Sequence, residues 1–159
     1  MKGLKGTKTA ENLMKSFAGE SQVRARYTFY SSMAKKEGYV QISNIFMEIA
    51  EQEKEHAKRF YKFLKNDFED EAIEITTAYT VALHEDTLSN LKKAAIGEKE
   101  EWIDLYLDFA SIARVEGFEE IAVTFEEISE VERRHGARYS KLAKNIKENT
   151  VFKKHKPVL

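Results

Sequence analysis

The sequence contains no cysteine and only one proline, and these two absences narrow both the fold and the chemistry. Without cysteine the chain forms no disulfide, no zinc ribbon and no thiolate-bound iron, and it has no thiol nucleophile. Any metal must therefore be held by histidine, aspartate and glutamate. The single proline is Pro157, near the C-terminus. Almost nothing interrupts helical periodicity, so the composition is typical of an all-α protein.

The sequence also lacks an excess of either charge and long apolar runs. The 26 basic and 27 acidic side chains nearly cancel, which argues against a nucleic-acid partner or attraction to an anionic membrane. No run reaches the roughly 18 to 20 apolar residues that span a bilayer, and residues 1–5 contain no signal-peptide core. We therefore expect a cytoplasmic protein. The length of 159 residues suits one domain with a sizeable core.

The two halves of the sequence resemble each other when one is shifted by 79 positions, so that residues 48–56 align with 127–135. Gly38 aligns in the same way with Gly117. Glycine readily adopts the left-handed conformation that ends a helix. Each half is predicted to be a helix, a tight glycine turn and a second helix. The expected helices are at about residues 8–37, 40–66, 86–116 and 119–147.

The lengths of the connections predict the topology. Short glycine turns make antiparallel hairpins, whereas the longer, charge-rich link at residues 67–85 must carry the chain across the bundle. We predict a ferritin-like four-helix bundle made of two repeated helical hairpins joined by a long crossover. It is expected to occupy residues 1–148, followed by a tail or linker at residues 149–159.

Apolar residues spaced by three and four positions mark the inward face of each helix. In the third helix this line is Leu88, Leu91, Ala95, Glu98, Trp102, Leu105 and Phe109. Polar residues on or beside the four inward faces are Glu20, Glu53, His56, Glu98, Glu101, Glu132 and His135. Counted from the two turn glycines, four of the glutamates lie within one helical turn in height. Isolated buried carboxylates cost several kcal/mol or more, so such a convergence requires a compensating charge.

The spacing Glu-x-x-His occurs twice, at Glu53 and His56 and again at Glu132 and His135. It puts a carboxylate and an imidazole on one helix face. With one further glutamate from each of the other two helices, this is the ligand set of di-iron and di-manganese carboxylate bundles. A lone glutamate or histidine on an apolar face is more often structural, but the repetition over four helices argues for metal. Oxygen donors with two imidazoles suit iron or manganese, and spacing alone does not exclude zinc or cobalt.

With these residues the chain resembles the rubrerythrin family over essentially its whole length. The segments that carry the resemblance are residues 18–22, 52–57, 97–101, 132–135 and 145–152. Rubrerythrins are peroxidases whose reduced di-iron site splits hydrogen peroxide and is then re-reduced by a one-electron donor. The resemblance implies a hydrogen peroxide reductase with two non-haem irons that protects against oxidative stress. Its electrons would come from NADH through a rubredoxin-like or other carrier.

The resemblance also assigns roles to individual residues. Rubrerythrins differ from ferritins by an additional carboxylate on the third helix, which corresponds to Glu101. It implies that one iron is bound by Glu101 when oxidised and by His56 when reduced, so these two residues act in catalysis. One iron would be held by Glu20, Glu53, Glu132 and that pair, and the other by Glu53, Glu98, Glu132 and His135. An exposed position of Glu101 within the surrounding charged run is the alternative.

Tyr27 and Tyr106 occupy corresponding positions of the two repeats, facing inward about two turns from the glutamates. Their hydroxyls are expected to hydrogen-bond ligand carboxylates, as groups around metal ligands commonly do. The alternative is a pair of core tyrosines whose hydroxyls are satisfied elsewhere.

Most rubrerythrins also carry a rubredoxin domain with two Cys-x-x-Cys pairs, which this cysteine-free sequence lacks. We expect a truncated chain rather than a naturally short relative. We also expect a homodimer, in which the long crossover would allow hairpins to exchange between chains. Two other functions stay open: a ferritin-like ferroxidase that oxidises iron with oxygen, and a metal-free helical adaptor.

Overall fold

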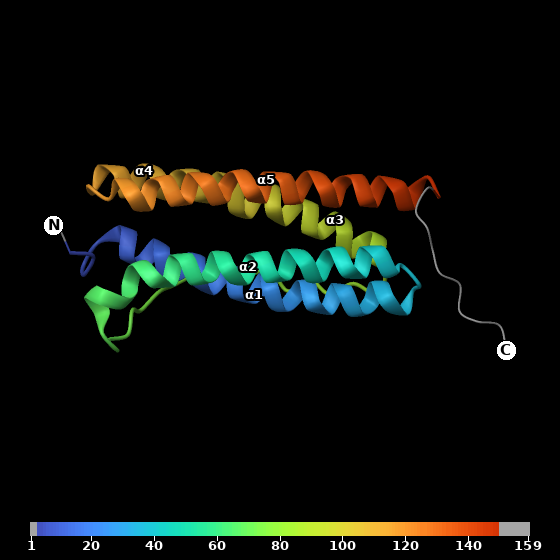
Figure 1. Cartoon of the computed structure of the whole chain (residues 1–159), viewed down its shortest axis with the longest axis horizontal. Coiled ribbons are helices and arrows are strands. Elements are labelled where there is room, and N and C mark those ends of the chain that lie inside the picture. Colours follow the sequence, from blue (N-terminus) through green and yellow to red (C-terminus); the bar gives the residue numbers. More distant parts are fainter. Residues whose placement is uncertain (1–2, 150–159) are drawn as a thin grey trace.

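The computed structural model describes residues 3–149, without the side chains of residues 100 and 101. Two helical hairpins lie side by side along their length (Figure 1). The elements in chain order are α1 (Lys8–Lys36), α2 (Val40–Phe68), α3 (Thr87–Gly97), η1 (Glu98–Ile103), α4 (Asp104–Val115) and α5 (Glu119–Lys147). The predicted all-α class and the ferritin-like bundle of two hairpins are confirmed. Of the tail expected at residues 149–159, all but the first residue lies outside the described part.

The two hairpin turns have the same structure because they have the same sequence pattern. Gly38 and Gly117 adopt φ values of 86° and 92°, which L-residues with a side chain rarely adopt. Beside them the amide of Tyr39 donates to the carbonyl of Ala34 at 2.8 Å, as the amide of Phe118 does to the carbonyl of Ala113. This bond closes the last turn of α1 and of α4 in a Schellman motif.

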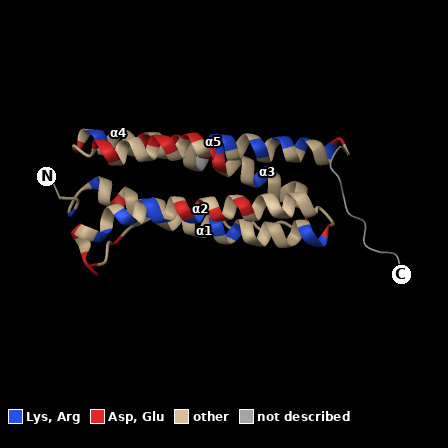
Figure 2. Ribbon diagram, viewed as in Figure 1, with Lys and Arg blue, Asp and Glu red and all other residues tan. Residues whose placement is uncertain are grey.

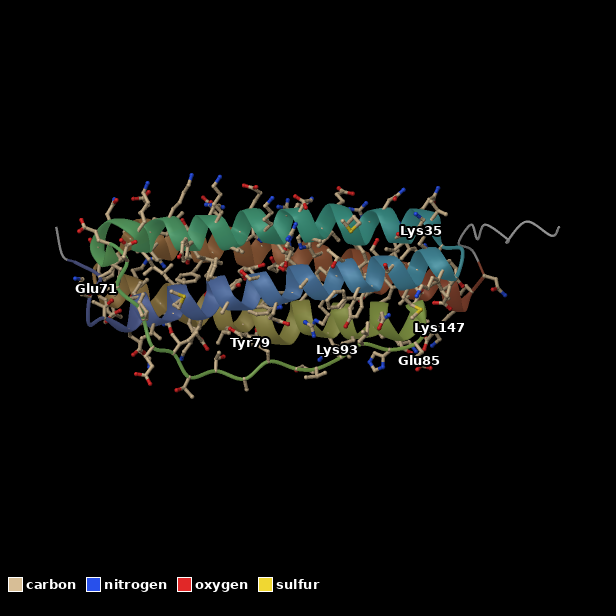
Figure 3. The ribbon with its side chains drawn as sticks, turned by 90° about the horizontal axis from the view of Figure 1, so that it is seen from below. Lys35, Glu71, Tyr79, Glu85, Lys93 and Lys147 are labelled. Atoms are coloured by element: carbon tan, nitrogen blue, oxygen red, sulfur yellow. The ribbon has the colours of Figure 1, made fainter. Side chains whose placement is uncertain are left out.

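The crossover runs along the outside of the bundle from the end of α2 to the start of α3, as Figure 3 shows between Glu71 and Glu85. It has no regular secondary structure over residues 71–84. Two tyrosines attach it to α1: Tyr79 donates to the carbonyl of Lys15 at 2.9 Å, and Tyr30 donates to the carbonyl of Ala82 at 2.5 Å. The long link predicted from the sequence is therefore held against the first helix.

A carboxylate at the end of each hairpin's first long helix caps the first helix of the other hairpin. Glu37 accepts hydrogen bonds from the amide and the hydroxyl of Thr87 at the start of α3, both at 2.5 Å. Glu116 accepts bonds from the amides of Lys8 and Thr9 at the start of α1. Acidic groups at helix N-termini satisfy unpaired amides and interact favourably with the helix dipole. These bonds fix the two hairpins at the same height.

The third long helix is interrupted by the π-helical segment η1. The repeat explains why: Tyr27 and Tyr106 lie 79 positions apart, whereas Glu20 and Glu98 lie 78 apart. The second hairpin thus contains one additional residue between these points, and a π-turn accommodates an inserted residue without ending the helix. The prediction of one unbroken helix at residues 86–116 missed this interruption.

The inserted residue also corrects one core assignment. Leu105 and Tyr106 were both predicted to face inward, but the side chain of Leu105 is 39% exposed, whereas Tyr106 is fully buried as predicted. After the π-turn, the residues of α4 that face the core are shifted by one position toward the C-terminus, compared with an unbroken α-helix. The largest fully buried side chains are Leu13, Tyr27, Tyr30, Ile42, Phe46, Ile49, Phe60, Leu91, Tyr106, Phe125, Ile128 and Tyr139.

Charges of both signs are distributed along the outer faces of the helices, without a face of one sign in view (Figure 2). No described helix combines the length and the apolar character needed to cross a membrane.

The indole ring of Trp102 in η1 packs directly on Gly19 of α1, and an alanine at Gly19 tests this contact. An added Cβ would lie 2.3 Å from Cη2 of Trp102. Overpacking costs about 1–3 kcal/mol, which exceeds the roughly 1 kcal/mol that alanine gains over glycine inside a helix. We expect Gly19→Ala to lower the free energy of unfolding in urea by about 1 kcal/mol, but to raise it in a Trp102→Leu background. Equal effects in both backgrounds would contradict the contact.

Candidate metal centre

Six ionisable side chains from four helical segments meet in the middle of the bundle. They are Glu20 from α1, Glu53 and His56 from α2, Glu98 from η1, and Glu132 and His135 from α5. All six are at most 7% exposed. The helical hairpins bring them to one height because each lies a similar number of residues from its glycine turn. The predicted convergence of these six residues is what the structure shows.

The six side chains form two overlapping groups in which one ligand atom of each residue lies within 4.8 Å of the others. One group is Glu20, Glu53, His56 and Glu132, and the other is Glu53, Glu98, Glu132 and His135. Glu53 and Glu132 belong to both. Each of these two carboxylates has two oxygens, so each can face both groups at once.

His56 directs its Nδ1 atom at three carboxylates. This nitrogen lies 2.9 Å from Oε1 of Glu132, 3.3 Å from Oε1 of Glu53 and 3.8 Å from Oε1 of Glu20. Although burial opposes it, the hydrogen bond with Glu132 and the nearby carboxylates of Glu53 and Glu20 raise the pKa of His56 to about 10. Without metal, the imidazolium of His56 thus supplies positive charge to this group.

His135 occupies the equivalent place in the other group. Its Nδ1 lies 3.4 Å from Oε1 of Glu53, 3.6 Å from Oε2 of Glu132 and 3.9 Å from Oε1 of Glu98. Its other ring nitrogen, Nε2, lies 2.6 Å from Oε1 of Gln52. Sequence analysis missed Gln52, because nothing in its spacing distinguishes it from the other polar residues around the Glu-x-x-His motif.

The two tyrosines singled out from the sequence bind carboxylates across the hairpins. Tyr27 donates to Oε1 of Glu98 at 2.6 Å, and Tyr106 donates to Oε1 of Glu20 at 2.7 Å. Burial, followed by the nearby carboxylates, raises the pKa of both hydroxyls well above the ordinary value. Both therefore remain protonated donors. Each bond engages one oxygen of its carboxylate and leaves the other for the centre of the cluster.

Several buried ligand atoms have no hydrogen-bond partner among the described residues. They are Oε2 of Glu20, both oxygens of Glu53, Oε2 of Glu98, Oε2 of Glu132 and Nδ1 of His135. Unpaired buried acceptors of this kind are expensive, and here they all belong to the same cluster. Two divalent cations would satisfy them, so the residues present fit a pair of metal ions with oxygen and imidazole ligands.

The protonation of the carboxylates indicates how much charge the cluster holds without metal. Burial, and next the charge of Glu132, raise the pKa of Glu53 to about 8 and raise those of Glu20 and Glu98 as well. Burial also acts on Glu132, but the close approach of Glu98, His135 and His56 holds its pKa well below the usual range. Because metal ligands must be deprotonated, cation binding would release protons from this cluster.

Glu101 belongs to the π-helical backbone of η1, but its side chain lies outside the described residues. The assignment of Glu101 as a ligand, like the metal-binding roles of the other six residues, stays a prediction. Glu101 lies in the segment in which the second hairpin has one residue more than the first.

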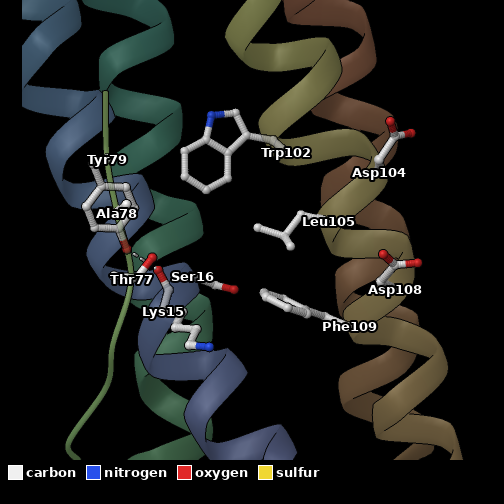
Figure 4. A pocket seen from close by; sticks show the side chains of 10 residues that line it. All are labelled: Lys15, Ser16, Thr77, Ala78, Tyr79, Trp102, Asp104, Leu105, Asp108 and Phe109. Carbon is white, nitrogen blue, oxygen red and sulfur yellow. Dashed lines mark hydrogen bonds between the residues drawn. The ribbon is translucent and has the colours of Figure 1, made fainter. Parts of the chain in front are cut away.

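A separate cavity of about 500 Å³ lies between the crossover, α1, η1 and α4 (Figure 4). Tyr79 and Thr77 of the crossover face Trp102, Leu105 and Phe109 across it. None of the six clustered side chains lines this cavity. The cluster of carboxylates and histidines is separate from this cavity and lies in the interior of the bundle.

The metal-free chain is expected to lose stability as the pH rises, because Glu53 holds a proton in the folded state. Its pKa is about 8 when folded and 4.5 ordinarily, so the stabilisation is complete below pH 4.5 and is lost as the pH rises through 8. The raised pKa of His56 acts in the same sense at higher pH.

Urea unfolding of chelator-treated protein measures this dependence. We expect the free energy of unfolding to fall between pH 4.5 and 8, with a slope of at most about 1.4 kcal/mol per pH unit for each proton released. Because the pKa values of Glu20, Glu98 and His56 are raised as well, Glu53→Gln should make the fall shallower without removing it. A free energy that rises over this range would contradict the protonation of Glu53.

Comparison with known proteins agrees with this geometry. The family model described as Rubrerythrin matches residues 11–143. Rubrerythrin from Clostridium perfringens is 64% identical over 159 residues, which cover 100% of this chain and 82% of that protein. Rubrerythrin-1 from Clostridium acetobutylicum is 62% identical, over 97% of this chain and 79% of that protein.

Solved structures show the same fold. Nigerythrin in its fully reduced, all-ferrous state aligns with a TM-score of 0.76 and 27% identity over 91% of this chain and 73% of that chain. Bacterioferritin from Desulfovibrio desulfuricans, described with a di-iron site in different catalytic states, aligns with a TM-score of 0.66 and 18% identity over 91% of this chain and 87% of that chain. At 18% identity, the second similarity concerns the fold alone. From the match of the family model and the identity with rubrerythrins along the chain, it follows that this protein belongs to the rubrerythrin family, which is a family of di-iron proteins.

Proposed function

We propose that this chain is a non-haem di-iron peroxidase that reduces hydrogen peroxide to water in defence against oxidative stress. One observation carries the proposal: two groups of buried ligand atoms share Glu53 and Glu132 and contain acceptors without hydrogen-bond partners. Two adjacent ions with shared carboxylates suit the two-electron cleavage of an O–O bond. A reduced pair of iron ions bound here would supply those two electrons.

The proposed ligands follow the two groups. Glu53 and Glu132, which belong to both groups, would be shared by the two ions. Glu20 and His56 would complete one set, and Glu98 and His135 would complete the other. Manganese or zinc would fit the same donor atoms in place of iron.

Tyr27 and Tyr106 are proposed to orient the two terminal carboxylates. Each hydroxyl donates to one oxygen of Glu98 or Glu20. Such a bond holds the carboxylate plane and aims its second oxygen at the metal. Because both tyrosines come from the opposite hairpin, they also resist separation of the hairpins.

His56 and Glu101 are proposed to alternate as ligands with the oxidation state. A higher metal charge favours an anionic oxygen donor over neutral imidazole, whereas a lower charge favours imidazole. Glu101 lies in the π-helical segment, and the position 78 residues earlier in the first hairpin is Val23, which cannot bind a metal. The two groups of ligands would then differ in chemistry although the helices that carry them are related by the repeat.

Electrons are proposed to reach the site from an external one-electron donor, such as a rubredoxin-like protein linked to NADH. A homodimer, with exchange of hairpins between chains, is also proposed, because the crossover over residues 71–84 is long enough to span the bundle.

Two metal ions per chain are expected, and loss of a shared carboxylate should remove both. Glu53→Ala or Glu132→Ala deletes an oxygen donor from each group at once, so metal analysis should find close to none bound. Glu55→Ala is the matched control, since Glu55 lies on α2 but is exposed. A Glu53 variant that retains two ions with unchanged optical spectra would contradict the bridging assignment.

The reduced protein is expected to react with hydrogen peroxide much faster than with oxygen. Stopped-flow reoxidation with each oxidant measures the preference. Glu101→Ala should slow reoxidation by peroxide while two ions and the helical content are kept, because the oxidised state then lacks its anionic ligand. Reaction at the parental rate would refute the role of Glu101, and a parental preference for oxygen would favour the ferroxidase alternative.

A further inference from the structure

The two histidines of the cluster differ in the hydrogen-bond partner that the repeat provides for Nε2, the ring nitrogen that faces away from the carboxylates. Nε2 of His135 lies 2.6 Å from Oε1 of Gln52 on the neighbouring hairpin. In the repeat, His135 corresponds to His56 and Gln52 corresponds to Val131. The side chain of Val131 offers neither a donor nor an acceptor. The repeat therefore provides an amide partner for one histidine and none at the equivalent position for the other.

The contact with Oε1 of Gln52 favours the tautomer of His135 that carries its proton on Nε2. A neutral imidazole protonated at Nε2 donates to Oε1 of Gln52 and presents the lone pair of Nδ1 to the cluster. That nitrogen faces Glu53 at 3.4 Å and Glu132 at 3.6 Å and has no hydrogen-bond partner of its own among the described residues. A metal ligand requires this arrangement, since the coordinating nitrogen must be unprotonated.

Gln52 is well placed to resist rotation of the ring. It precedes Glu53 in α2, so the segment that supplies a shared carboxylate also supplies the anchor of His135. Its side chain is partly buried, and the ring of His135 is 5% exposed. Rotation of the ring would break the 2.6 Å bond in a site where water can replace it only poorly.

We propose that Gln52 is a positioning residue that fixes His135 as a permanent metal ligand through Nδ1, whereas Val131 leaves His56 free to leave its metal. The proposal rests on the proposed di-iron function, and it explains why the exchange with Glu101 concerns His56 rather than His135. Gln52 acts on the metal only through the imidazole.

Zinc, which is diamagnetic, allows the proposal to be tested without turnover. In protein loaded with Zn²⁺, the nitrogen NMR shifts of the His135 ring should show Nδ1 bound to metal and Nε2 protonated, with a slowly exchanging Nε2 proton. Coordination through Nε2 in the parental protein would overturn the proposal before any variant is made.

Variants of Gln52 then test the anchor itself. Gln52→Met keeps the length of the side chain but removes the acceptor, and it should weaken binding of one of the two Zn²⁺ ions by roughly 10- to 100-fold in chelator competition. Gln52→Glu restores an acceptor oxygen and should recover the Nε2-protonated tautomer of His135. Affinity and tautomer unchanged in Gln52→Met would refute the role of Gln52.

The experiment distinguishes a wrong assignment of the metal site from a wrong assignment of Gln52. If the parental chain does not bind two Zn²⁺ ions, the proposed metal site is wrong and the inference is overturned with it. If it binds two, but Gln52→Met binds them as tightly, only the role of Gln52 is refuted. If Gln52→Met does not fold, the tautomer in the parental protein and in Gln52→Glu decides the question.

Discussion

The structure depends on one electrostatic constraint: four carboxylates are buried together where they cannot all carry charge. Glu20, Glu53 and Glu98 have raised pKa values because of burial, and only Glu132 retains a low one. A hydrophobic core of this size gains nothing from such a cluster in the absence of cations. The arrangement is understandable as a site whose stability is completed by positive charge, and this is the property a di-iron family requires.

The repeat makes the site possible, and the departures from the repeat make it chemically asymmetric. Each hairpin supplies one Glu-x-x-His motif, one further glutamate and one tyrosine that binds the other hairpin's carboxylate. The two hairpins differ at two places close to the cluster. The segment η1 has one residue more than the equivalent part of α1, and Val131 occupies the position that corresponds to Gln52. A symmetric pair of ligand sets would offer both metals the same choices. In the proposed exchange, the two departures would allow one set to stay fixed while the other changes.

Much of this architecture could be predicted from the sequence because it depends on local patterns. Turn glycines set the helix ends, apolar spacing set the inward faces, and residue counts from Gly38 and Gly117 set the height of the glutamates. The repeat predicted that Tyr27 would bind a carboxylate of the cluster, but not that this carboxylate is Glu98, and it did not predict the bond of Gln52 to His135. Both partners lie on the opposite hairpin and depend on how the hairpins pack. The π segment, in contrast, could have been predicted from the sequence, because the offset between the repeats changes from 78 at Glu98 to 79 at Tyr106.

The π segment connects the fold to the chemistry more directly than the symmetric elements do. An unbroken helix would have put Leu105 in the core, but the inserted residue turns Tyr106 inward, and Tyr106 then reaches Glu20. The same insertion lies in the segment that carries Glu98 and Glu101. A single inserted residue thus sets the register of the tyrosine beyond it, in the same segment that contains the proposed additional ligand Glu101.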